Sequence, residues 1–288
     1  YNAIKRIIED GRIGEVVTIQ AMEQVGYWHQ AHSYVRGNWR RAEDTTPMIL
    51  AKCCHDLDLL QHFAGAKCES VSSVGDLTYF TSVNAPEGAA KRCLDCKYLD
   101  SCPYSAKTLY IEKWKKQGRP ENCWPYNVLT MALPLTEEAI GEAIKNGPYG
   151  RCVFACDNDV VDHQLTQMTF QNGVKATLTM TAFTADGGRI MKFYGTTGEV
   201  VLDETRDVIE VKPFGGEKRA LGLSALNESG YGHGGGDYGL VRELYEVLCG
   251  REKTTTSLEE SVESHLIGIC AEESRKAGGK LVKIHENV

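Results

Sequence analysis

Two alternating stretches joined by a two-residue turn constrain the fold more than any other feature of this chain. Residues 160–170 and 174–183 alternate apolar and polar side chains, which is typical of strands with one buried face. Asn172-Gly173 lies between them and favours the tight turn of a β-hairpin. A second hairpin is predicted for residues 189–203, around the turn at 195–198. The chain is therefore built around an antiparallel sheet.

Helices flank these strands along the sequence. A helix is predicted over residues 1–13, ending at Gly11, and is followed by a strand at 15–25 and a polar, aromatic-rich loop at 26–46. Further helices are predicted at 47–64, 135–146, 237–249 and 257–277, and further strands at 69–80 and 207–212. Ser257 and Glu260 form a capping box at the start of the last helix. This order predicts an α+β fold, an open, mostly antiparallel sheet of about five or six strands with helices on one face.

The composition limits the classes of partner. A net charge of −7 disfavours nucleic acid and anionic membranes, because both need a basic surface. No apolar run approaches the roughly 20 residues that span a bilayer. Eleven cysteines in 288 residues, an odd number, favour reduced thiols, so we expect a cytoplasmic protein. We also expect a homodimer or tetramer, because an open apolar sheet face needs a covering partner.

The predicted helix at 47–64 carries the main chemical candidates. A threonine N-cap and Pro47 in the first turn mark its beginning. Lys52, His55, Asp58 and His62 follow one another at three- or four-residue spacing on one face. An amine, an imidazole and a carboxylate aligned in this way can hold a proton donor, its orienting partner and a substrate contact.

Four segments of the chain resemble a known family. They are Gly11-Arg-Ile-Gly-Glu-Val-Val17, the helix end from His55-Asp-Leu-Asp58 to Gly65, the hairpin Phe193-Tyr-Gly-Thr-Thr-Gly-Glu-Val200 and the closing segment 257–284. In this order they resemble the C-terminal, substrate-binding domain of the Gfo/Idh/MocA family (glucose–fructose oxidoreductase, inositol dehydrogenase and MocA). The resemblance covers nearly the whole chain. It implies an NAD(P)-dependent oxidoreductase acting on a sugar, polyol or related polyhydroxy compound.

The resemblance also implies that the cofactor domain lies outside this sequence. The family's glycine-rich phosphate loop and its Glu-Lys-Pro lysine do not occur here, and the glycine-rich string at 230–235 lacks a preceding apolar strand. We therefore expect residues 1–14 to be a connecting helix from a nucleotide-binding domain. Residues 15–288 would form the substrate and oligomerisation domain, with a cysteine-bearing insertion at about 81–150. We expect no cofactor-binding residue in this piece, which alone would be redox-inactive.

His55 matches the family's histidine that faces the nicotinamide and assists proton transfer. The resemblance implies that His55 is the general acid/base, or assists a lysine of the other domain, with Lys52 and Asp58 beside it. Family members often carry an aspartate four residues earlier, where this chain has Ala51. That departure leaves open a structural role for His55, paired with Asp58.

The loop at 26–46 and two later histidines are candidates for substrate binding. Aromatic faces stack on sugar rings and arginines bind carboxylates or hydroxyls. The candidates are Tyr27, Trp28, Arg36, Trp39, His163 and His233. An ordinary sheet-edge loop or an oligomer contact is an equal alternative for the loop. His163 is expected to face the helix layer and the pocket, with the opposite face of the sheet as the alternative.

A cysteine cluster is the sharpest local motif. Cys93-x2-Cys96-x5-Cys102 predicts a metal knuckle in a segment that is short of core-forming residues. Structural zinc with Cys123 as fourth ligand is the expectation, Cys152 and Cys156 being alternative fourth ligands. An iron–sulfur cluster and free thiols stay open.

Two rival functions remain open. One is an NAD-dependent glycoside hydrolase on the same scaffold. The other is a non-catalytic, zinc-stapled binding or oligomerisation module, which the Ala51 departure favours.

Overall fold

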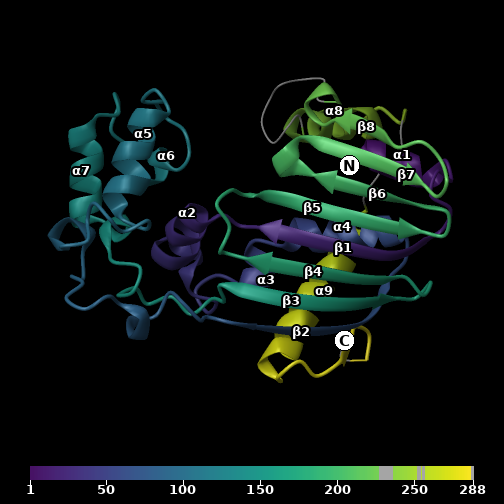
Figure 1. Cartoon of the computed structure of the whole chain (residues 1–288), viewed down its shortest axis with the longest axis horizontal. Helices are drawn as coiled ribbons and strands as arrows, with labels where there is room; N and C mark the ends of the chain where they lie inside the picture. Colours follow the sequence, from purple (N-terminus) through teal and green to yellow (C-terminus); the bar gives the residue numbers. More distant parts are fainter. Residues whose placement is uncertain (227–235, 252–253, 255–256, 287–288) are drawn as a thin grey trace.

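The computed structural model describes residues 1–226, 236–251, 254 and 257–286. In this part of the chain a nine-stranded sheet has the order β8-β7-β6-β5-β1-β4-β3-β2-β9 (Figure 1). The strands are β1 Val16–Gln24, β2 Cys68–Asp76, β3 His163–Phe170, β4 Lys175–Thr181, β5 Gly188–Gly195, β6 Gly198–Asp203, β7 Val208–Pro213, β8 Arg219–Gly222 and β9 Val282–Lys283. The central strands β1 and β4 pair in parallel, and the other neighbours pair antiparallel.

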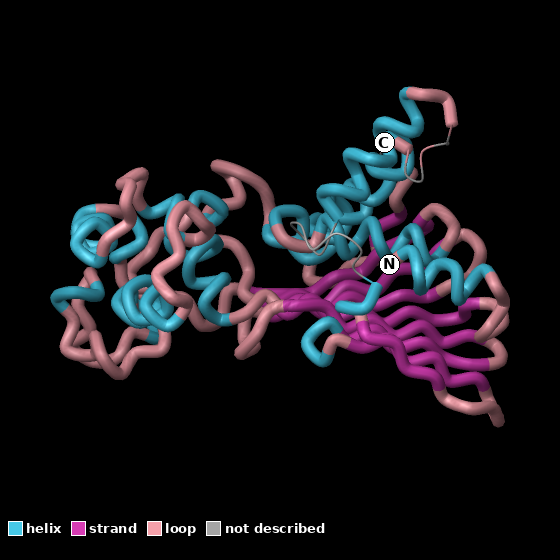
Figure 2. The backbone as a smooth tube through the Cα atoms, turned by 90° about the horizontal axis from the view of Figure 1, so that it is seen from above, coloured by secondary structure: helices cyan, strands magenta, loops and turns pink. Residues whose placement is uncertain are grey.

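Helices cover one face of this sheet. They are α1 Asn2–Glu9, α3 Met48–Ala51, α4 Cys54–Ala64 and α9 Leu258–Lys276, whereas α8 Gly236–Leu248 has no buried residue. In Figure 1, α4 and α9 lie behind the sheet, and Figure 2 shows the helices gathered along one side of it. Strand alternation turns Ile19, Leu178 and Phe193 toward these helices, where each is at most 1% exposed. Burying one such side chain contributes about 1.5–3 kcal/mol, so this layer contact holds the fold together.

The opposite face of the sheet carries no covering helix in the described chain and is more polar than expected. Thr18 and Gln20 of β1 and Thr177 and Thr179 of β4 point to this open face. Apolar side chains are interspersed among them, for example Leu165, which is 47% exposed.

The sequence predicts the α+β class correctly and the size of the sheet incorrectly. The sheet has nine strands rather than about five or six. The outermost strands, β8 and β9, contain four and two residues. Such short edge strands cannot show an alternating pattern, since they are defined by pairing with a neighbour.

The predicted helix at 47–64 is interrupted. It consists of α3 and α4, which are separated at Lys52 and Cys53, where Lys52 has φ −115°. The predicted threonine N-cap is also wrong. Pro47 occupies the cap position without a side-chain hydrogen bond, and the Thr45 hydroxyl instead donates to the carbonyl oxygen of Arg41.

Residues 77–162, between β2 and β3, form an insertion lobe beside the sheet, at the left of Figure 1. Its helices are α5 Lys113–Lys116, α6 Tyr126–Leu129 and α7 Glu137–Asn146. The expectation of few core residues is wrong, because the lobe has its own apolar cluster. Buried members include Phe80, Leu109, Tyr110, Trp114, Tyr126, Ile140, Ile144 and Val153.

The segment predicted as a loop at 26–46 is largely helical and completes this second core. It begins with α2 Tyr27–His29, continues as a wide helical turn over Gln30–Arg36 and ends in a short turn over Asn38–Arg40. Ala31 and Val35 are fully buried in the lobe's cluster. The segment therefore joins the lobe to the end of β1.

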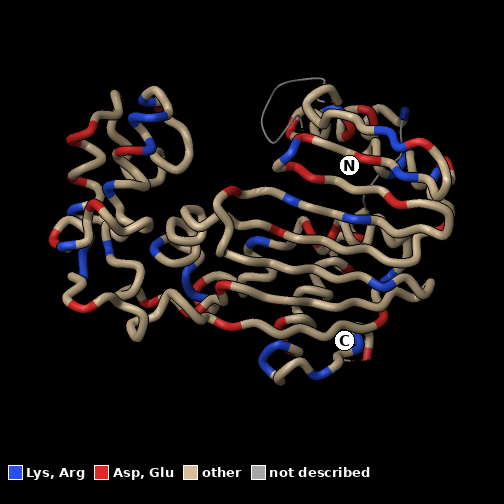
Figure 3. The backbone as a smooth tube through the Cα atoms, viewed as in Figure 1, with Lys and Arg blue, Asp and Glu red and all other residues tan. Residues whose placement is uncertain are grey.

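Charged residues of both signs are interspersed over the sheet and the insertion lobe (Figure 3). None of the helices in the described residues is long and apolar enough to cross a membrane.

Candidate active site

A buried ionic network lies where α4 begins above β1 and β5. The Nζ atom of Lys52 lies 2.6 Å from Oε1 of Glu23 on β1. Arg189 on β5 contacts Oδ1 of Asp56 through Nε at 2.9 Å and Oε2 of Glu23 at 3.4 Å. Glu23 and Asp56 are 1% and 2% exposed. Two carboxylates can stay in such a buried position because two cations compensate them.

The interruption between α3 and α4 places Lys52 in this network. Lys52 closes α3 with a widened φ of −115°, and its side chain reaches Glu23 across the layer interface. The network in turn perturbs Glu23. Burial raises the pKa of that carboxyl, the neighbouring Asp56 adds to the rise, and Lys52 and Arg189 oppose it.

His55 lies in the first turn of α4 and is exposed. It has no hydrogen-bond or ion-pair partner among the described residues. No hydrogen bond or ion pair joins His55 to Asp58 in the described residues, and Asp58 acts electrostatically on His62, one turn further along the helix. Among the predicted helix-face residues, Lys52 is thus held by Glu23, whereas His55 is exposed.

An aromatic wall stands at the end of β1. The rings of Trp28 and His29 on α2 lie 5.1 and 4.9 Å from the ring of Trp124 in the insertion lobe. Lys113 Nζ, also from the lobe, lies 3.1 Å from the ring centroid of Trp28. These contacts bring the lobe against the segment at 26–46, which the sequence predicts as a candidate for substrate binding.

The wall and the ionic network act on the same histidine. Burial, together with the positive charges of Lys52 and Lys113, lowers the pKa of His29 to about 4. Burial also lowers the pKa of Lys113 to about 8. His29 is therefore neutral at physiological pH and lies within the field of two lysines from different parts of the chain. The sequence pattern did not mark His29, Lys113 or Trp124 as a group, since only the fold brings them together.

Other predicted substrate residues are placed differently. Tyr27 packs edge-on against Tyr104 with a centroid distance of 6.0 Å, and Trp39 is 37% exposed. His163 shares the strand parity of Leu165, on the open sheet face, and not the helix-facing orientation expected for it. Its Nδ1 lies 2.8 Å from the fully buried carboxylate of Asp162, which fixes it there. His233 lies outside the described residues.

Arg36 is a structural residue of the insertion lobe. It is 0% exposed, and it donates to the carbonyl oxygens of Arg151 and Tyr104 at 2.7 Å each. Such burial removes it from a substrate-binding position in this structure.

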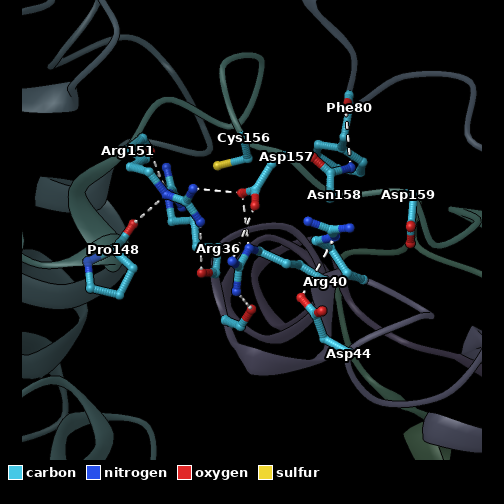
Figure 4. Close-up of polar contacts among 12 residues, drawn as sticks. Arg36, Arg40, Asp44, Phe80, Pro148, Arg151, Cys156, Asp157, Asn158 and Asp159 are labelled. Atoms are coloured by element: carbon cyan, nitrogen blue, oxygen red, sulfur yellow. Dashed lines mark hydrogen bonds and ion pairs between the residues drawn. The ribbon is translucent and has the colours of Figure 1, made fainter.

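An ion cluster next to Arg36 fastens the loop to the lobe (Figure 4). The Asp157 carboxylate accepts from Arg151 at 2.6 Å and from Arg40 at 2.9 and 3.1 Å. The Arg40 guanidinium, with Arg151 adding to it, holds the pKa of Asp157 well below its usual range. Asp157 thus ties the helical loop to the end of the lobe.

The zinc expectation is not supported. Among the residues that the structure describes, no group of three or more His, Cys, Asp or Glu is placed to hold a metal ion. Cys93, Cys96 and Cys102 do line one cavity, together with Cys152. Cys123, the expected fourth ligand, is not in that lining and precedes α6.

The fold is that of a C-terminal alpha/beta domain of an oxidoreductase family. The chain belongs to the Gfo/Idh/MocA family. Residues 5–284 match the family's sequence model for its C-terminal domain, described as "Oxidoreductase family, C-terminal alpha/beta domain". It is 22% identical over 280 residues to "Putative oxidoreductase YteT" of Bacillus subtilis (strain 168), covering 90% of this chain and 62% of that protein.

Solved structures share the fold. Levoglucosan dehydrogenase in complex with NADH and levoglucosan superposes with a TM-score of 0.61 at 14% identity, covering 98% of this chain and 62% of that one. An oxidoreductase from Agrobacterium radiobacter in complex with NAD+, L-tartaric acid and magnesium gives a TM-score of 0.60 at 14% identity, covering 100% and 62%. The chain thus spans about three fifths of the length of these relatives.

Proposed function

We propose that this chain is the substrate-binding part of an NAD(P)-dependent oxidoreductase that acts on a sugar, polyol or related polyhydroxy compound. The observation that carries the proposal is His55. It is exposed at the start of α4, beside the buried Lys52–Glu23 pair, in a chain that matches the family over residues 5–284. The dehydrogenase with levoglucosan and NADH, which has the same fold, supports a polyhydroxy substrate.

In this proposal each residue has a distinct task. His55 moves a proton at the substrate hydroxyl, or assists a lysine outside this chain, because its imidazole is exposed and uncommitted. Lys52 is a positioning residue, since Glu23 holds its amine. Trp28 and Trp124 offer ring faces to a sugar-like substrate, and Lys113 offers a positive charge beside them. The nicotinamide, when bound, supplies hydride transfer.

We further propose that the cofactor is held by residues outside this chain, and that residues 1–14 connect to them. Support comes from the match to a C-terminal domain and from the coverage of about three fifths of the relatives. Titration of NADH into the longer natural protein, followed by fluorescence, should show binding that residues 1–288 alone do not show. NADH binding by this chain alone would contradict the proposal that residues outside it hold the cofactor.

A substrate screen then tests the reaction class. The longer protein should reduce NAD+ or NADP+ with a sugar or polyol, and the His55→Ala variant should lose that activity. Release of sugar from an aryl glycoside without net NADH would indicate a glycoside hydrolase instead. No NADH binding by the longer protein would indicate a binding module.

Assembly and compartment complete the proposal. We propose a homodimer or tetramer formed through the open sheet face, on the support that no helix of the described chain covers it. Light scattering after gel filtration should show two or four copies, and charged substitution of Leu165 should reduce that number. All eleven cysteines are unpaired, which supports a reducing compartment such as the cytoplasm.

A further inference from the structure

The insertion lobe contains a cavity that the proposed reaction does not use. Its volume is about 210 Å³, and its lining includes neither His55 nor any of Trp28, His29, Lys113 and Trp124 at the aromatic wall. An apolar cavity of about 150 Å³ is large enough for a benzene ring. The cavity in the lobe therefore has room for a ring that carries one further small group.

The cavity extends from an exposed rim into the interior of the lobe. Pro86, Ser101 and Pro103 in its lining are exposed, whereas Arg36 and Ser105 are 0% and 1% exposed. A small molecule can enter past the rim and reach the two buried polar residues. Any group that it presents to them is then removed from water.

The fold builds this cavity from the two ends of the lobe. Arg92 and Arg151 form an antiparallel bridge, and the Cys152 N–H donates to the Lys91 carbonyl at 2.9 Å. This pairing places Cys152 in one lining with Cys93, which is distant in sequence. The walls are thus held by backbone pairing and do not need a ligand to bring them together.

The wall of the cavity is apolar and almost free of charge. Apart from Arg36, none of the described residues that line it has a basic or carboxylate side chain. The ring of Tyr79 lies 5.9 Å from that of Tyr104, and both line the cavity. Burial raises the pKa of the Cys102 and Cys152 thiols, so both stay protonated at neutral pH. Such a wall suits an aromatic or aliphatic body.

Arg36 brings a positive charge that lacks a negative partner. Its Nε and Nη2 atoms donate to carbonyl oxygens, whereas Nη1 has no hydrogen-bond partner in the described chain. The side chains that act on it electrostatically are Tyr110, Cys93 and Cys156, and none of them is a carboxylate. A buried cation with an unsatisfied N–H is costly unless an anion pairs with it.

Ser105 supplies a second polar group without a partner. Its buried hydroxyl makes no hydrogen bond in the described chain, and the residue lines the same cavity as Arg36. Most buried hydroxyls have a partner, so this one needs an explanation. A hydroxyl and a guanidinium N–H can both donate to carboxylate oxygens. One bound carboxylate can therefore satisfy both residues.

We propose that this cavity binds a small aromatic monocarboxylate, with its ring against Tyr79 and Tyr104 and its carboxylate toward Arg36 and Ser105. Ligand pockets commonly combine an apolar wall with a few polar groups that fix orientation. A neutral ring would leave the Arg36 charge unpaired, and a carboxylate without a ring would leave the apolar wall uncovered. The inference does not depend on the proposed dehydrogenase activity, because binding is measured without substrate or cofactor.

Calorimetric titration of the longer natural protein with benzoate tests this proposal. We expect one benzoate to bind per chain. Benzamide has the same ring without the charge and should bind at least about tenfold more weakly, because it loses a charge-assisted pairing with Arg36. Acetate has the charge without the ring and should also bind at least about tenfold more weakly, because it buries less apolar surface.

Two neighbouring alanines locate the bound benzoate. Ala89 lines the cavity and Ala90 does not, and both are half-buried. Ala89→Leu adds three carbons inside the cavity and should weaken benzoate binding at least about tenfold. Ala90→Leu is the matched control and should leave the affinity unchanged. Thermal unfolding of both variants shows that each is folded.

Three results would overturn the proposal. One is the absence of benzoate binding by the unaltered protein at concentrations up to about 10 mM. Another is benzamide binding as tightly as benzoate, which would show that no anion is recognised. The third is an equal effect of Ala89→Leu and Ala90→Leu, which would place benzoate outside the cavity. The unaltered protein alone decides the first two, so a variant that fails to fold does not protect the proposal.

Discussion

Arg189 on β5 grips Asp56 on α4 with two of its nitrogens, at 2.9 and 3.3 Å from the two carboxylate oxygens. Asp56 is 2% exposed and directly follows His55 in the first turn of the helix. A two-point contact of this kind fixes orientation as well as distance. The position of the exposed His55 therefore depends on a strand residue more than 130 positions away.

Arg189→Met should strongly destabilise the protein. It leaves the carboxylates of Asp56 and Glu23 buried with only Lys52 to compensate them. Breaking such a buried pair costs about 3–5 kcal/mol, which urea unfolding measures directly. Arg251→Met is the matched control, because its ion pair with Glu246 is on the surface and should change little. Equal effects of the two substitutions would contradict the network's role.

His29 should make the protein sensitive to acid. The pKa of His29 is about 4 in the folded chain, against 6.5 for an ordinary histidine, as in the unfolded chain. Below pH 6.5 the unfolded chain therefore binds a proton that the folded chain excludes. The stabilisation is complete above pH 6.5 and is lost as the pH falls toward 4. His29→Gln should reduce the loss of unfolding free energy between about pH 7 and about pH 5 by about 1–2 kcal/mol.

The surface histidine His265 provides the control for this effect. It is exposed on α9, so His265→Gln should leave the pH dependence as it is. His32 contributes in the same direction, since burial lowers its pKa to about 3. The His29→Gln variant should therefore keep part of the acid sensitivity. A profile identical to that of the unaltered protein would show that His29 is not excluded from protonation by the fold.

These sites show which features the sequence could predict. The strands on either side of Asn172-Gly173 follow from alternation that is written within each segment. The break between α3 and α4 has no such signal in its own segment, and there Lys52 forms an ion pair with Glu23 on the distant strand β1. Arg36 is of a residue type that often binds substrates. In the fold it is buried and donates to the carbonyls of Arg151 and Tyr104, more than 60 residues away. Cysteine spacing likewise could not distinguish Cys152 from Cys123, since spacing carries no information about which loop ends meet.

His55→Ala in the longer natural protein should lower kcat with little change in stability. The side chain is exposed and makes no contact whose loss would weaken the described fold. Loss of a positioned general acid or base typically costs about 100- to 10,000-fold in rate. Steady-state kinetics with the best substrate of the screen, together with thermal unfolding, separates the two effects. Unchanged kcat would remove His55 from the chemistry and favour the non-catalytic reading.

Lys113→Met should reveal whether the insertion lobe takes part in substrate binding. The Lys113 amine lies over the Trp28 ring and acts on His29. Lys116, on the same short helix, is exposed and makes neither of these contacts. If the wall of Trp28, His29 and Trp124 receives the substrate, loss of the charge should raise KM by up to about tenfold, as expected for a contact of about 0.5–1.4 kcal/mol. Lys116→Met should leave KM unchanged. A rise in KM that both variants share would reflect the net charge of the lobe, and no rise in either would place the substrate away from this wall.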